Sequence, residues 1–178
     1  GSHAFEIVGM SKGAQLVLAA SSRKKIGVFA TEFTINSGAH KAAILAADDG
    51  ADVYPQACPK FVPLIEGEQF GSAEVMSAGA EYAAPLKAAG IDTLILSCTH
   101  YPFIQKEIES EFGSEVTVID PADATAQDTK LVLAAEGLLR SEGAGSLEVC
   151  FTADVERGAR IAGRMLPQEK CRFKEIKL

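Results

Sequence analysis

The stretch "DTLILSCTHYPFIQKEIESEFG", residues 92–113, decides the fold class of this protein. It begins with a short run of branched apolar side chains, which is typical of a parallel strand covered on both faces. From Pro102 onwards the spacing of the apolar residues indicates a helix, with the proline in the first turn, where its missing N–H group costs nothing. A buried strand followed at once by a helix is the repeating unit of an α/β protein.

The same alternation of strand and helix extends through the rest of the chain. We predict strands at 24–31, 52–59, 92–97, 115–120, 147–152 and 171–178. We predict helices at 11–21, 35–50, 72–90, 102–113, 122–143 and 154–166. This order predicts the α/β class, with a parallel sheet that carries helices on both faces.

Proline and glycine residues modify three parts of this prediction. Pro55 argues against a central position for strand 52–59, because proline cannot donate a hydrogen bond to a neighbouring strand. Pro85 is expected to kink helix 72–90 or to end it early. Segment 61–71 is punctuated by a proline and two glycines, and we predict a loop there.

The composition is typical of a soluble globular protein. Hydrophobic residues make up 47% of the 178 residues and charged residues 23%, with a net charge of −7 and a pI near 5.0. An evenly acidic chain repels phosphate backbones, so we expect no nucleic-acid partner. We expect no membrane partner either, because no apolar run approaches the roughly 18 residues of a membrane span and no secretory signal pattern opens the chain.

The four cysteines have neither a CxxC spacing nor a metal-finger pattern; they are Cys58, Cys98, Cys150 and Cys171. We predict free thiols in a reducing cytoplasm, with Cys58 and Cys150 serving as packing residues. His40 is interpreted as a surface or interface residue of helix 35–50. Neither a convergent set of metal ligands nor a glycine-rich phosphate motif is present, so we predict no metal and no nucleotide cofactor.

Cys98 lies at the end of a predicted strand, where ligands of parallel α/β sheets bind. Because a helix begins shortly afterwards, we expect its positive end and its free N–H groups to lower the pKa of the thiol. Thr99 and His100 add a hydroxyl and a proton-transfer group to the same loop. The alternative is a buried free cysteine of no chemical role.

Two further places carry polar side chains that are ambiguous when taken alone. Thr31 and Thr34 follow another predicted strand and could receive a small carboxylate, although threonine is also an ordinary helix cap. We expect Thr34 or Ser37 to cap helix 35–50. Glu66 follows an apolar segment, and most carboxylates in such positions are simply solvated.

Five segments resemble the glutamate racemase family and occur in its order: "IGVFATEFTINSGAHKAAI", "YPQACPKFVPLIEGE", "IDTLILSCTHYPF", "VTVIDPADA" and "CFTADVER". The resemblance runs from about residue 26 to about residue 166, and "CTHYP" is its most specific part. It implies a cofactor-independent enzyme that interconverts L- and D-glutamate for peptidoglycan synthesis. In this family two cysteine thiols exchange the α-proton on opposite faces of the substrate, which is general acid–base chemistry on a weak carbon acid.

The resemblance also implies a role for each candidate residue. Cys98 matches the second of the two catalytic cysteines, and His100 matches a residue that assists this thiol. Glu66 resembles an acid that positions the histidine. The implied substrate contacts are made by four residues: Thr31, Thr34, Thr99 and His100.

The sequence departs from the family pattern at three places. Ser97 stands before the cysteine and Ala30 before the threonine, where the family usually has glycine. The family's Asp-Ser-Gly motif and the Cys-Asn-Thr stretch that carries the first catalytic cysteine do not occur in these 178 residues. We therefore expect this chain to carry one of the two catalytic thiols and to be inactive alone.

The family template also predicts the domain organisation. Residues 1–3 are typical of the remnant of a cleaved purification tag, and residues 24–125 are expected to form a complete α/β domain. Residues 4–23 and 126–178 are expected to be parts of an incomplete first domain. Apolar helix faces left uncovered there favour a homo-oligomer.

Two other functional hypotheses remain beside the racemase. The chain could be a non-catalytic domain that binds a small acid or associates with itself. A hydrolase using Cys98 and His100 alone would need a third residue to orient the histidine, and the sequence pattern indicates none.

Overall fold

The structure is a computed structural model that describes residues 7–9, 13–140, 142–143, 145–166 and 171–177. The chain divides into two compact units, Gly1–Leu139 and Arg140–Leu178, and each is described by itself. In the described part of the chain, no helix has the length and apolar composition needed to cross a membrane.

The first unit is built around a four-stranded parallel sheet with the strand order β2-β1-β3-β4. Its strands are β1 (Lys25–Ala30), β2 (Asp52–Ala57), β3 (Thr93–Leu96) and β4 (Thr117–Ile119). The register places Phe29 of β1 opposite Leu96 of β3, and Ala30 opposite Ala57 of β2. The carboxyl ends of β1, β2 and β3 are therefore level with one another.

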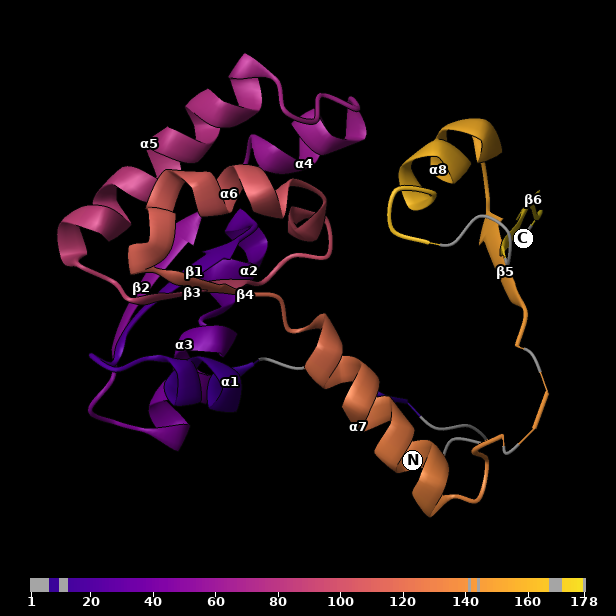
Figure 1. The fold of residues 1–178 in the computed structure, drawn as a ribbon, viewed down its shortest axis with the longest axis horizontal. Helices are drawn as coiled ribbons and strands as arrows, with labels where there is room; N and C mark the ends of the chain where they lie inside the picture. The colour runs from indigo at the N-terminus through magenta and orange to yellow at the C-terminus, as the bar shows by residue number, and fades with distance from the viewer. Residues whose placement is uncertain (1–6, 10–12, 141, 144, 167–170, 178) are drawn as a thin grey trace. The chain divides into compact units, whose positions relative to one another are not determined.

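Helices cover both faces of this sheet (Figure 1). One face carries α4 (Phe61–Glu66), α5 (Ala73–Ala89) and α6 (Gln105–Phe112); the other carries α1 (Ala14–Ala20) and α3 (Ala39–Ala47). Each face has its own apolar core: Phe29, Leu94 and Leu96 point to the first, and Val28 and Ile95 to the second. This alternation is the period of two expected of a covered strand.

The remaining elements of this unit lie in its connections. They are α2 (Glu32–Ser37), the 3₁₀ turns η1 (Tyr101–Ile104) and η2 (Gly113–Glu115), and α7 (Ala122–Ala135). The predicted parallel sheet with helices on both faces is thus confirmed. β2 pairs with β1 alone, and the edge position explains how Pro55 is tolerated there.

One loop prediction and several helix predictions were wrong in detail. Segment 61–71 contains helix α4, because Pro63 falls in its first turn, where a missing N–H group is harmless. Predicted helix 35–50 is two helices, α2 and α3, divided at Gly38 with a φ of 66°. The cap of α2 is Thr31 rather than Thr34 or Ser37.

Helix α5 continues through Pro85 to Ala89, contrary to the early end considered from the sequence. Pro85 and Glu81, one turn before it, are both exposed, so the carbonyl group that loses its partner can be hydrated. Ser72 and Gly90 cap this helix as predicted, with the Ser72 hydroxyl accepting a hydrogen bond from the N–H of Val75.

Helices α6 and α7 differ from the prediction only at their ends. The predicted helix 102–113 opens with the 3₁₀ turn η1 before α6 begins at Gln105. Helix α7 ends at Ala135 instead of continuing to residue 143, and the N–H of Gly137 (φ 67°) closes its last turn on the carbonyl of Ala134.

The second unit is small and pairs two parallel strands with one helix. Strands β5 (Leu147–Phe151) and β6 (Cys171–Glu175) are joined through α8 (Val155–Ala162). Gly158 of α8 lies so close to the Phe151 ring that an added Cβ atom would stand 2.4 Å from it. The domain boundaries inferred from the family template, after residue 23 and after residue 125, stay a prediction.

Candidate active site

The site is built where β1, β2 and β3 end together at the carboxyl edge of the sheet. Backbone hydrogen bonds continue one residue beyond the strands: the N–H of Ser97 donates to the Phe29 carbonyl at 2.8 Å, and the N–H of Cys58 to the Ala30 carbonyl at 2.9 Å. The residue after Ser97 is Cys98, and the residue after Ala30 is Thr31. The sheet therefore delivers both candidate segments to one edge.

Cys98 lies half-buried in the loop between β3 and η1. Burial raises the pKa of its thiol, and this outweighs the lowering by the N–H groups of His100 and Tyr101. The pKa direction expected from the helix end alone was wrong, because packing against the α4, α5 and α6 face removes the thiol from water. At neutral pH the group is therefore a protonated thiol.

His100 stands between the thiol and a carboxylate. Its Nδ1 atom is 4.0 Å from Sγ of Cys98, and its Nε2 atom is 2.8 Å from Oε1 of Glu66. Glu66 is the last residue of α4, a helix held to the core by the fully buried side chains of Phe61 and Ile65. The structure thus brings together Cys98, His100 and Glu66, and Glu66 is more than a solvated carboxylate.

Two threonines, Thr31 and Thr34, follow the carboxyl end of the neighbouring strand β1. Oγ1 of Thr31 and Oγ1 of Thr34 are 3.0 Å apart, and the N–H of Thr34 donates to Oγ1 of Thr31 at 3.4 Å. Thr31 therefore serves as the N-cap of α2, while the pair still presents two hydroxyl groups at the carboxyl edge of the sheet. Thr99 is exposed in the loop between Cys98 and His100.

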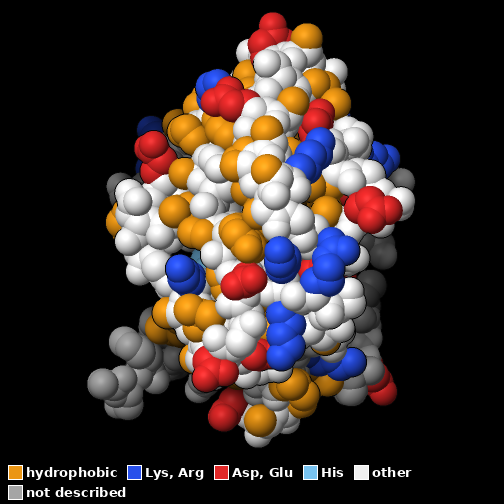
Figure 2. Space-filling model, turned by 90° about the vertical axis from the view of Figure 1, so that its left-hand side faces the viewer, with side chains coloured by type: hydrophobic (Ala, Val, Ile, Leu, Met, Phe, Trp, Pro, Cys, Tyr) orange, Lys and Arg blue, Asp and Glu red, His pale blue; other side chains and the backbone are white. Residues whose placement is uncertain are grey.

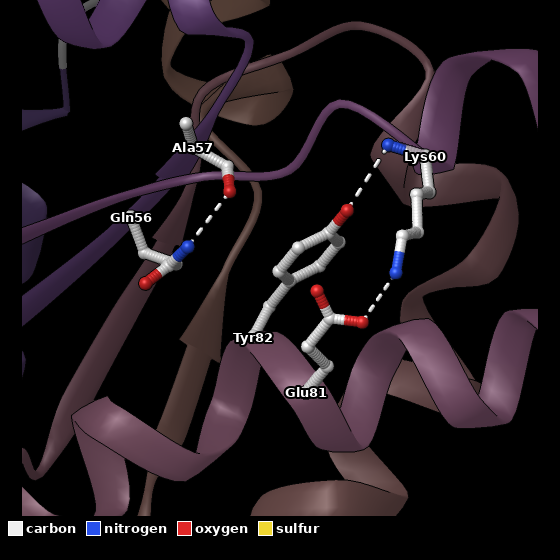
Figure 3. Close-up of polar contacts among 5 residues, drawn as sticks. All are labelled: Gln56, Ala57, Lys60, Glu81 and Tyr82. Carbon is white, nitrogen blue, oxygen red and sulfur yellow. Dashed lines mark hydrogen bonds and ion pairs between the residues drawn. The ribbon is translucent and has the colours of Figure 1, made fainter.

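Contacts between α4 and α5 support the helix that carries Glu66 (Figure 3). The backbone N–H of Lys60 donates to the Tyr82 hydroxyl at 3.1 Å, and its ammonium group pairs with Glu81. Tyr82 is 4% exposed and its ring meets that of Phe61 edge-on at 5.2 Å. These contacts hold the start of α4 in place, and they thereby help to position its last residue, Glu66, beside His100.

Two buried residues of the site region were missed by sequence reasoning. Tyr101 is fully buried, and its hydroxyl donates to the Cys58 carbonyl at 3.3 Å. His40 was interpreted as a surface or interface residue, but it is only 9% exposed. Its Nδ1 atom is 3.3 Å from the hydroxyl oxygen of Ser97. It is the second residue of α3, and only the packing of α3 across the sheet brings it to the end of β3.

One face of the molecule carries charged side chains of both signs as well as apolar side chains. Figure 2 shows lysines, arginines and carboxylates interspersed over one face, with scattered apolar groups between them. Among the described residues, no group of three or more His, Cys, Asp or Glu side chains has an arrangement that could hold a metal ion.

The fold and this site define a class of protein: a parallel α/β domain that presents a thiol, an imidazole and a carboxylate at the carboxyl edge of its sheet. The sequence model of the Asp/Glu/Hydantoin racemase family matches residues 7–129. The chain belongs to this family.

Curated relatives and solved structures agree with the assignment. The chain is 40% identical over 136 residues to glutamate racemase of Lysinibacillus sphaericus (76% of this chain, 51% of the relative). It is 44% identical over 128 residues to glutamate racemase of Lactiplantibacillus plantarum (71% and 47%). It thus spans about half the length of these curated relatives.

Two crystal structures of glutamate racemases superpose on most of the chain. Isoform RacE1 from Bacillus anthracis matches with a TM-score of 0.82 at 29% identity, covering 94% of this chain and 62% of that one. The enzyme from Francisella tularensis, solved with D-glutamate, matches with a TM-score of 0.78 at 26% identity, covering 94% and 61%.

Proposed function

We propose that the protein is a glutamate racemase that interconverts L- and D-glutamate without a cofactor, and that Cys98 is one of its two acid–base thiols. The observation that carries the proposal is the Cys98–His100–Glu66 arrangement at the carboxyl edge of the sheet, inside the region matched by the family. The names of its relatives, and D-glutamate in the Francisella tularensis enzyme, support this substrate. Its product would serve peptidoglycan synthesis in the cytoplasm.

The geometry suggests how Cys98 exchanges a proton with the substrate. A neutral imidazole that donates from Nε2 to Glu66 presents an unprotonated Nδ1 to the thiol, 4.0 Å away. His100 can take the thiol proton when Cys98 must act as a base, and can return it afterwards. Because burial keeps the thiol protonated at rest, Cys98 is prepared to donate a proton to the α-carbon.

The substrate would be held by groups that surround this thiol. The hydroxyls of Thr31 and Thr34 are suited to the α-carboxylate, because carboxylate oxygens accept hydrogen bonds from hydroxyl donors. Thr99 is exposed beside Cys98 and can donate to the same substrate. Holding the carboxylate with fixed donors stabilises the carbanion formed when the α-proton leaves.

Proton transfer on the opposite face of the α-carbon needs a second thiol. Cys58 is buried beneath the site, with its pKa raised by burial, and Cys150 and Cys171 belong to the Arg140–Leu178 unit. We therefore expect these 178 residues to exchange the α-proton of one stereoisomer without net racemisation. A homo-oligomer remains part of this proposal.

The test is proton NMR of L- and of D-glutamate incubated with the protein in D₂O. Loss of the α-proton signal from one stereoisomer is expected, and Cys98→Ala should abolish it. Cys150→Ala is the matched control, because it removes a thiol of the other unit. Equal exchange by the parent and by Cys98→Ala would refute the role of Cys98.

The hydrolase alternative is not favoured, although Glu66 supplies the orienting residue that it needs. A nucleophilic cysteine is activated by a lowered pKa, whereas burial raises the pKa of Cys98. A thiol that rests protonated suits proton donation better than attack on a carbonyl carbon.

A further inference from the structure

A buried polar contact lies directly behind the loop that carries Cys98. Nδ1 of His40 and Oγ of Ser97 are 3.3 Å apart, and both residues are buried. His40 and Ile44 are the buried residues of α3 and stand one turn apart. Ile44 packs in the apolar core beneath the sheet, so His40 forms the outer layer of this helix–sheet contact at the carboxyl edge.

Ser97 is held at two points. Its backbone N–H is bonded to the Phe29 carbonyl of β1, and its side chain meets His40 of α3. Side chains alternate along a strand, so Ser97 faces α3 like Ile95, whereas Cys98 packs against the core on the opposite face. Any influence of His40 on the thiol must therefore pass through the backbone of Ser97.

A second anchor stands on the other side of the loop. The N–H of Tyr101 donates to the Cys98 carbonyl at 3.1 Å, and the buried Tyr101 hydroxyl donates to the Cys58 carbonyl at 3.3 Å. The three residues Cys98–His100 therefore span two buried attachments. The mobility left to the thiol depends on both of them.

His40 also shares a cavity with Thr34, one member of the threonine pair. It lines a small cavity of about 50 Å³ together with Thr34, and with Val28, Ile35, Gly38, Lys41 and Pro55. The same imidazole thus borders the strand end that carries the hydroxyls and touches the strand end that carries the thiol.

We propose that His40 and Ser97 are a positioning pair, whose buried hydrogen bond holds Cys98 in its place at the end of β3. The inference rests on the proposed function only in giving Cys98 an acid–base role. An apolar pair would fill the same space without the cost of burying two polar groups. A polar pair instead requires one geometry, because its hydrogen bond is lost when the loop shifts.

The test measures the rate at which iodoacetamide alkylates Cys98, followed by mass spectrometry of the peptide that contains it. Ser97→Ala and His40→Leu should each raise the rate about threefold or more, because a loosened loop admits water and reagent to a thiol that is now half-buried. His40→Asn should restore a rate close to the parent's, because the asparagine amide can replace Nδ1. The double variant should react no faster than the faster single variant.

Two controls separate positioning from a general loss of structure. Ile44→Val should lower stability without changing the Cys98 rate, because Ile44 is buried one turn away in the same helix. Cys150, exposed in the other unit, is the internal reference in each digest. Unchanged or lowered rates in the single variants would overturn the inference, as would additive effects in the double variant or failure of His40→Asn to restore the parent rate.

The outcome is independent of glutamate turnover. Additive alkylation rates would refute the positioning pair and leave the racemase proposal standing. Absence of α-proton exchange in the parent, with non-additive alkylation rates in the double variant, would refute the exchange activity proposed for Cys98 and leave the pair standing.

Discussion

The two ends of β3 differ in how well their polar groups are satisfied. Before the strand, Asp92 is 8% exposed and accepts from Ser21 Oγ at 2.5 Å, Ser22 Oγ at 3.1 Å and the N–H of Arg23 at 2.7 Å. After the strand, Cys98 has His100 at 4.0 Å, and His100 pairs with a Glu66 that is 45% exposed.

The pKa directions express the same contrast. Burial would raise the pKa of Asp92, but the hydrogen bonds from Ser21, Arg23 and Ser22 outweigh it and lower the pKa. For Cys98, burial wins and the pKa is raised. At the amino end of β3, Asp92 therefore carries a negative charge that stabilises the fold. At the carboxyl end, the Cys98 thiol keeps a proton that it can donate. The groups that stabilise the fold and the groups of the proposed proton transfer therefore lie at opposite edges of one sheet.

The largest expected effect is on stability at the amino end. Asp92→Ala leaves two hydroxyls and one backbone N–H without their acceptor, so we expect the free energy of unfolding to fall by about 3 kcal/mol. Urea denaturation followed by circular dichroism measures it. The matched control is Cys98→Ala at the other end, which should cost about 1 kcal/mol or less. Equal losses from the two variants would contradict the division between the edges.

The contribution of Asp92 should also depend on pH. Because its pKa is lowered in the folded protein, its stabilisation is complete above the pKa of the unfolded chain, near 3.8, and is lost as the pH falls through the folded value. The difference in urea midpoint between the parent and Asp92→Asn should therefore shrink as the pH is lowered from about 5 to about 2. A difference that stays constant over this range would show that the charge of Asp92 contributes nothing.

The contrast between the edges also explains what the sequence could predict. The α/β alternation and the carboxyl-edge position of Cys98 follow from local apolar patterns, which survive folding unchanged. The family resemblance named Cys98, His100 and Glu66, and the structure brings these three together. These are local properties, or properties carried by short motifs.

Properties that depend on tertiary packing could not be predicted from the sequence. The pKa direction of Cys98 depends on the core that covers it, and distant residues such as Phe61 and Tyr82 form part of that core. His40 and Ser97 are 57 positions apart, so their contact has no signal in either segment. Helix α4 was missed because Pro63 was interpreted as a breaker, when its place in a first turn made it compatible with a helix.

A smaller effect is expected at the threonine pair. Thr31→Ala removes the side-chain cap of α2, and we expect a loss of about 1 kcal/mol in the free energy of unfolding. Thr31→Ser keeps the capping oxygen and should restore most of that stability. In the exchange assay Thr31→Ala should raise the glutamate concentration needed for half-maximal rate, because a carboxylate donor is lost. Thr31→Ala with unchanged stability would show that α2 does not depend on this cap.

The smallest effect on stability is expected at Glu66. At this residue we expect a small change in stability together with a large change in the exchange rate. Glu66→Gln keeps the shape of the side chain and its hydrogen-bonding reach to Nε2 of His100 but removes the charge. The pair is partly exposed to solvent, so the free energy of unfolding should change by about 0.5 kcal/mol or less. The α-proton exchange rate should nevertheless fall about tenfold or more, since the imidazolium formed when His100 takes the thiol proton loses its carboxylate partner. Glu148→Gln, which breaks the exposed ion pair with Lys174 in the Arg140–Leu178 unit, is the matched control and should leave the exchange rate unchanged. A Glu66→Gln variant that exchanges as fast as the parent would remove the carboxylate from the proton-transfer chain and leave Cys98 and His100 to act without it.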